Sequence, residues 1–180
     1  MTTAPDEVIE RVGGYIRHNA TKEPRAIREL VQRGHEQLVS LIDGLSEEQA
    51  RFKPAADKWC VLELLRHVVS AKRGVARICA QLARGEQPTD FGGEGEEQDG
   101  VMGSREFVSL AEAREALEAA HDQLLAFVDG PLAEANLDLR FRHFLFGELS
   151  CREWAAFQRV HDGDHAAQIE QIKSAQEFPA

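Results

Sequence analysis

Hydrophobic residues recur every three or four positions in four long stretches of the chain, which is the spacing of amphipathic helices. The stretches cover residues 24–44, 60–84, 109–129 and 151–172. Pro24 suits the first position of a helix, and Ser109 and Ser150 each precede a Glu by three residues, as in a capping box. Because no stretch alternates convincingly between apolar and polar residues, the pattern predicts an all-α four-helix bundle.

The segments between these stretches are less regular. Residues 85–109 are long and rich in Gly and acidic residues. Loops of this length are uncommon in compact domains unless they are functional or disordered, so a lid over a site and a solvated acidic crossover are both open interpretations. Residues 131–149 concentrate Leu and Phe without helical spacing, which predicts a buried loop across one end of the bundle.

The first 23 residues stand apart from the predicted bundle. Their few apolar positions are interrupted by Gly13 and Gly14, which weaken a helix. We expect residues 1–23 to form a leader, loosely packed or folded as a short helix, and residues 24–180 to form one domain.

The last predicted helix carries polar side chains on its apolar side. The side chains on this side are Trp154, Phe157, His161, His165, Gln168 and Ile172. Buried polar groups need partners, and two His at i and i+4 can share a metal ion. The alternative is a pair of ordinary histidines bonded to backbone or water. Asp162-Gly163 is a turn signal, but the apolar spacing continues in phase across it, so we expect an unbroken helix.

His67 on the second predicted helix offers a third imidazole. Three His ligands with an open fourth position are typical of a catalytic zinc site. Glu63, Asp164 and Gln168 lie near the three histidines in sequence and are candidates to orient them.

Two further histidines fall at the border of their helices. We expect His35 to be partly buried with a backbone partner, and His121 to be exposed.

Composition and charge limit the classes of partner. The formal net charge of −10 disfavours nucleic acid and anionic membranes. No apolar run reaches the ~18 residues that a membrane span needs. Three widely spaced cysteines argue against a disulfide framework and favour a reducing cytoplasm. A small-molecule substrate remains the best candidate.

Three segments together resemble the DinB-like superfamily of damage-inducible, metal-binding bundles. They are Lys58-Trp59-Cys60-Val-Leu-Glu63-Leu-Leu-Arg-His67, Phe146-Gly147-Glu-Leu149-Ser150-x-x-Glu153-Trp154, and His161-x-x-x-His165-x-x-Gln168-Ile169. The chain departs from the family pattern at Cys60, where Ser is usual, and at Asp162-Gly163.

The resemblance implies up-down-down-up connectivity, with the long acidic segment as the crossover between the second and third helices. It also implies a zinc or nickel ion on His67, His161 and His165, and a homodimer. Because the superfamily includes thiol-dependent transferases, we expect a metal-activated thiol or water that attacks a small electrophile, with a low-molecular-weight thiol such as bacillithiol or mycothiol as co-substrate.

Two alternatives remain open at this point. One is a non-enzymatic, metal-binding or stress-linked dimeric bundle. The other is a purely structural role for all three histidines, which predicts no metal binding under any loading condition.

Overall fold

The computed structural model describes residues 5–91 and 106–180, and in them the fold is mostly helical, as predicted. The α-helices are α1 (Asp6–Ala20), α2 (Pro24–Ile42), α3 (Glu47–Arg51), α4 (Val61–Ala83), α5 (Leu110–Asp129) and α6 (Cys151–Lys173). A 3-10 helix, η1 (Pro131–Glu134), and two short strands, β1 (Phe141–His143) and β2 (Gly147–Leu149), lie between α5 and α6. Among the described residues, no helix is both long and apolar enough to cross a membrane.

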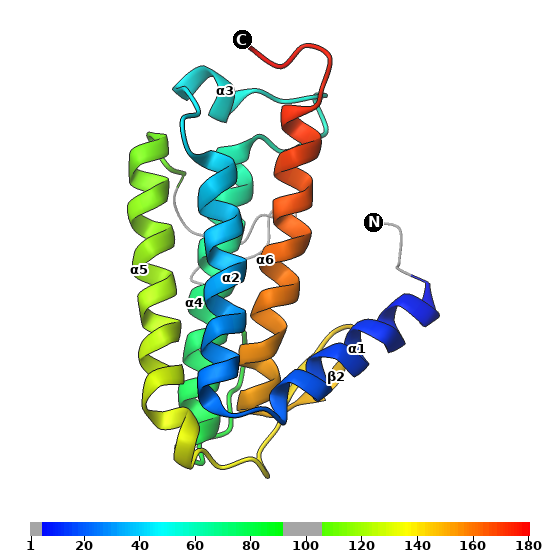
Figure 1. The fold of residues 1–180 in the computed structure, drawn as a ribbon, viewed down its shortest axis with the longest axis vertical. Helices are drawn as coiled ribbons and strands as arrows, with labels where there is room; N and C mark the ends of the chain where they lie inside the picture. The colour runs from blue at the N-terminus through cyan, green and yellow to red at the C-terminus, as the bar shows by residue number, and fades with distance from the viewer. Residues whose placement is uncertain (1–4, 92–105) are drawn as a thin grey trace.

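The four longest helices lie side by side along the long axis of the molecule (Figure 1). Helices α2 and α4 each pack against both α5 and α6. Their bounds follow the sequence signals closely: Pro24 occupies the first turn of α2, and Ser109 Oγ accepts a hydrogen bond from Glu112 N at the start of α5. Local sequence therefore sets where these helices begin.

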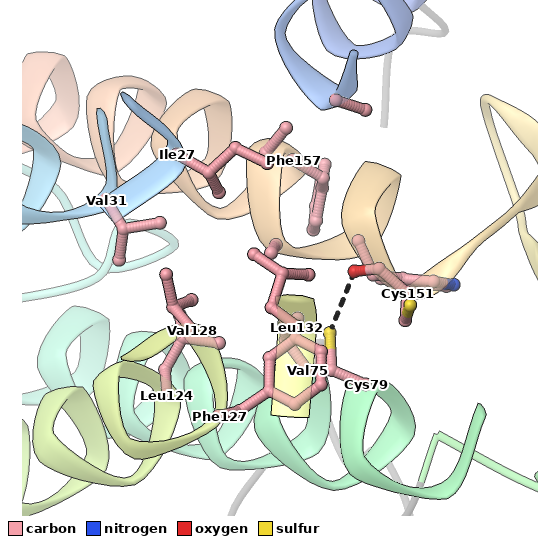
Figure 2. Close-up of a cluster of buried hydrophobic side chains, with 14 of the residues drawn as sticks. Ile27, Val31, Val75, Cys79, Leu124, Phe127, Val128, Leu132, Cys151 and Phe157 are labelled. Atoms are coloured by element: carbon pink, nitrogen blue, oxygen red, sulfur yellow. Dashed lines mark hydrogen bonds between the residues drawn. The ribbon is translucent and has the colours of Figure 1, made fainter. Parts of the chain in front are cut away.

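Two clusters of buried apolar side chains form the core. The first gathers residues of α2, α4, α5 and α6, including Val31, Val75, Leu124 and Phe157 (Figure 2). Within it, the Cys79 thiol donates a hydrogen bond to the Cys151 carbonyl oxygen, with 3.3 Å between Sγ and O. The second cluster uses the same helices nearer the other end of the bundle, and its members include Leu38, Val68, Ala120 and Ala166.

Residues 131–149 are more ordered than the predicted loop. After η1, the chain forms an antiparallel hairpin in which Phe141 pairs with Leu149 and His143 with Gly147. Gly147 has φ +74°, a left-handed conformation that glycine adopts without strain. The prediction of an irregular loop without strands was wrong here, because strands of three residues are too short to show an alternating pattern.

The leader forms a helix of 15 residues, α1, that packs against α6 at an angle to the other long helices (Figure 1). Ile16 is completely buried in the first cluster. Asp6 and Glu7 in the first turn, and Arg17 in the last, have the signs that the helix dipole favours. Most of the segment 85–109, for which a lid and a solvated acidic crossover were both open interpretations, lies outside the described residues, because residues 92–105 are not among them.

Candidate metal centre

Helix α4 brings His67 to the site, and its N-terminus is fixed by the Glu63 side chain. Cys60 is the N-cap residue, and its backbone N–H donates to Glu63 Oε2 at 2.9 Å. Lys53 Nζ contacts the other carboxylate oxygen of Glu63 at 2.7 Å. The hydrogen bonds that Glu63 makes among the described residues therefore go to the helix start and to Lys53 rather than to an imidazole.

Helix α6 supplies the other two imidazoles. It begins with a complete capping box, in which Ser150 Oγ accepts from Glu153 N and Glu153 Oε2 accepts from Ser150 N. The helix continues without interruption through Gly163 to Lys173. His161 and His165 are therefore one turn apart on the same face, as the sequence pattern predicted.

The three Nε2 atoms of His67, His161 and His165 converge. His161 Nε2 lies 3.2 Å from His67 Nε2 and 3.2 Å from His165 Nε2. All three ligand atoms lie within 4.8 Å of one another, and this is the one group of its kind found among the described residues. Ligand nitrogens about 2.1 Å from a tetrahedral zinc ion are separated by about 3.4 Å, so the two separations of 3.2 Å fit a first-row divalent ion.

Burial keeps these imidazoles in the form that binds metals. Burial, and then the neighbouring His165, lowers the pKa of His67 to about 4. Burial likewise lowers the pKa of His161 well below its usual value, with further contributions from His165, His67 and Lys72. The pKa of His165 is also lowered, chiefly by burial. Near neutral pH the rings are uncharged, and each has a nitrogen lone pair available to a cation.

Gln168 and Asp164 form a short chain behind His165. His165 Nδ1 lies 3.2 Å from Gln168 Oε1, and Gln168 Nε2 donates to Asp164 Oδ2 at 3.2 Å. An amide oxygen at Nδ1 favours the tautomer in which Nδ1 carries the proton, which leaves the Nε2 lone pair free for a metal. Of the three candidates to orient the ligands, Gln168 contacts a ligand ring and Asp164 supports Gln168.

The walls of the site are partly aromatic. The Trp59 ring lies 5.4 Å from that of His67, and the Phe157 ring 5.7 Å from that of His161. His143 of β1 packs 4.6 Å from Phe157, and its Nδ1 accepts hydrogen bonds from the backbone N–H groups of Leu145 and Phe146. His143 was not predicted as part of the site, because its neighbours in space come from a hairpin that the sequence pattern did not reveal.

A second polar group lies in the interior beside the site. Lys72 Nζ and Asp162 Oδ2 form an ion pair of 2.9 Å, and both side chains are 0% exposed. The ion pair was not predicted from the sequence, where Asp162 counted only as part of a turn signal. The signal was available: Asp162 shares helical spacing with Ala155, Ala166 and Ile169, all buried on a second face of α6.

His121 is 3% exposed, so the prediction that it lies at the surface was wrong. Its ring stacks on that of His35, with 3.8 Å between centroids and 4° between planes. His121 Nε2 contacts Gln32 Oε1 at 2.9 Å, and His35 Nε2 contacts Glu118 Oε2 at 3.0 Å, so the partners of His35 are side chains rather than backbone. The contact between α2 and α5 accounts for the burial of both rings. This contact cannot be predicted from the residue pattern of one helix alone.

Comparison with known proteins agrees with the geometry of the site. The chain is 24% identical over 143 residues to the uncharacterized protein YuaE of Bacillus subtilis (strain 168), a match that covers 73% of this chain and 88% of that protein. The sequence profile of the DinB superfamily matches residues 30–169, a range that includes all three converging histidines. The chain therefore belongs to the DinB superfamily.

Proposed function

We propose that this protein is a metal-dependent enzyme that binds a divalent ion, zinc or nickel, through His67, His161 and His165. The convergence of their Nε2 atoms, with two separations of 3.2 Å, is the observation that supports the proposal. An ion held there would lower the pKa of a thiol or water at an open coordination position, and so supply a nucleophile near neutral pH.

The side chains of the protein would then orient the reaction. Gln168 fixes the ring of His165 through Nδ1, and α4 and α6 hold His67 opposite His161. Trp59 and Phe157 give the site apolar borders, which suit the carbon framework of a small electrophilic substrate. The proposed activity is transfer to a low-molecular-weight thiol, or hydrolysis.

The proposal includes the up-down-down-up bundle and the homodimer expected from the sequence. The packing of α2 and α4 against both α5 and α6 supports the bundle. Light scattering of the purified chain tests the dimer directly, since a homodimer has twice the chain mass of 20.1 kDa.

Metal content tests the ligand set. After loading with zinc and removal of excess ion, wild-type protein should retain about one zinc per chain, as a three-His site predicts. His161→Ala should lose it, because two imidazoles hold an ion less tightly than three. His18→Ala, a matched change at an exposed histidine of α1, should retain it. A fully loaded His161→Ala protein with intact helical circular dichroism would contradict the assignment.

Activity separates the enzyme from the non-enzymatic alternative. Zinc-loaded protein should accelerate conjugation of a thiol such as bacillithiol or mycothiol to a small electrophile, or hydrolysis of an activated ester, and metal-free protein should not. If the protein binds zinc but the cobalt-substituted form shows no spectral change on addition of thiol, the fourth position is closed, and a metal-binding bundle without enzymatic activity is the better description.

A further inference from the structure

A layer of polar side chains divides the core of the bundle. Each of the four long helices carries buried polar side chains between residues of the first apolar cluster and residues of the second. They include His35 on α2, Lys72 on α4 and His121 on α5, and on α6 Asp162 together with Gln158 and His165. The layer thus lies between the two apolar clusters, and its members Lys72 and Asp162 form the buried ion pair.

The Lys72–Asp162 pair is tightly defined. Besides the contact with Lys72 Nζ at Oδ2, Asp162 accepts a hydrogen bond from Gln158 Nε2 at Oδ1, with 2.7 Å between the heavy atoms. Removing two charges from water carries a large desolvation cost, and apolar residues of similar volume often stabilise a fold as well or better. A pair at this position therefore needs a reason other than stability, and buried polar pairs can specify one arrangement of helices.

The pair connects the two helices that carry the converging histidines. Asp162 directly follows His161 on α6, and Lys72 lies five residues after His67 on α4. A shift of α6 by one residue moves it about 1.5 Å along its axis. Such a shift would disrupt the 2.9 Å contact of the ion pair and also the 3.2 Å approach of His161 to His67.

Helix α2 confines Asp162 from a third side. A Cβ atom at Gly34 would lie 3.2 Å from both Cβ and Oδ2 of Asp162. This close approach leaves the carboxylate little freedom to follow a displaced α6, since packed interiors have few voids.

We propose that the Lys72–Asp162 ion pair is a positioning device for the metal centre. It fixes the rotation and axial register of α6 against α4, so that the three imidazoles are preorganised for a metal ion. The inference rests on the proposed function, which supplies the metal, and assigns to Lys72 and Asp162 a role through the ligands rather than in contact with the ion.

The test compares zinc affinity in Lys72→Met/Asp162→Asn with that in Val128→Ala. The double variant removes both charges and keeps an acceptor for Gln158, and Val128→Ala creates a cavity in the first apolar cluster, on α5 (Figure 2). The zinc dissociation constant, measured by competition with a chelator, should rise about ten-fold or more in the double variant, the usual effect of losing an outer partner. It should stay within about two-fold in Val128→Ala, which removes no partner of the ligands. Equal zinc affinities in the two folded variants would overturn the proposal.

Metal-free protein provides a second measurement that does not depend on zinc. Ring protons of His67 and His165, whose centroids are 4.8 Å apart, should give nuclear Overhauser contacts in the wild-type and Val128→Ala proteins but not in the double variant. Persistence of these contacts in the double variant would refute the positioning role. A wild-type protein that binds no zinc would instead refute the proposed function, and the ring contacts would still test the register.

Gly34→Ala decides the matter if the double variant does not fold. The added methyl group would lie 3.2 Å from Asp162 Cβ and Oδ2, and also 3.2 Å from Arg159 Cδ. Pressure on Asp162 should weaken zinc binding, by about three-fold or more by analogy with loss of an outer partner. Gly14→Ala, where a Cβ meets nothing within 4 Å, is the control and should bind zinc as the wild type does. Unchanged affinity in Gly34→Ala would then count against the proposal.

Discussion

At the scale of residues, burial is the largest cause of a lowered pKa at six histidines: His35, His67, His121, His143, His161 and His165. At the candidate metal centre this keeps the rings neutral and ready to bind. In the His35–His121 stack it has another consequence, because two parallel rings 3.8 Å apart tolerate a positive charge poorly. The stability of the fold is therefore expected to depend on pH through the His35–His121 stack.

The folded protein should become less stable as the pH is lowered, because His121 binds a proton more readily in the unfolded chain than in the folded one. Burial, helped by His35, Lys72 and Arg28, lowers its pKa to about 3, whereas an unfolded histidine titrates near 6.5. Between these values the unfolded chain binds more protons than the folded one, so acid favours unfolding. Each such ring contributes at most about 1.4 kcal/mol per pH unit. Urea unfolding of metal-free protein at pH 7.5, 6.0 and 4.5 measures the loss.

His121→Gln isolates this contribution. The variant should lose less stability than the wild type between pH 6.5 and 4.5, because it lacks one of the titrating groups. An identical pH dependence in the two proteins would show that His121 titrates in the folded protein as it does in the unfolded chain.

At the scale of elements, α6 carries both a feature that the sequence predicted, the histidine pair, and one that it did not, the ion pair with Lys72. One side of the helix carries Trp154, Phe157, His161 and His165, and that stripe predicted the histidine pair. A second buried side carries Ala155, Gln158, Asp162, Ala166 and Ile169, because α6 packs against α1 and α2 as well as α4. A search for one apolar stripe assigns polar residues of the second side to the surface, so the ion pair with Lys72 was not predicted.

Gly163→Ala should stabilise α6. Alanine in a helix interior is favoured over glycine by up to about 1 kcal/mol. The new Cβ would lie 2.7 Å from Arg159 Nη1, the far end of a flexible side chain that can move aside. We expect a higher melting temperature and unchanged zinc content. A lower melting temperature would mean that Arg159 cannot leave its position without loss.

At the scale of the whole molecule, the sequence predicted most of the helical fold but little of how its parts meet. The periodic stripes and the capping signals at Ser150 and Pro24 act within a few residues, so they were readable. The β1–β2 hairpin, the burial of His121 and the docking of α1 through Ile16 depend on residues distant in sequence, and they required the three-dimensional structure. The candidate metal centre was an exception, because two of its three histidines are neighbours on one helix.

Zinc should raise the stability of the entire fold. Ligand that binds only the folded state at about 100 times its dissociation constant stabilises that state by about 2.7 kcal/mol. The melting temperature of the wild-type protein should therefore rise with free zinc, and that of His161→Ala should not. A zinc-independent melting curve for the wild type would contradict binding at the three histidines.

His67 and His161, two of the proposed ligands, are 94 positions apart in the chain, on two helices that α5 separates in sequence. An ion bound by both would be a reversible cross-link between the first half of the polypeptide and the second half. The metal content, and with it the melting temperature, would then depend on how the protein was purified, so a sample exposed to a chelator would differ from one grown in rich medium. Melting temperatures of variants should therefore be compared at the same free-ion concentration.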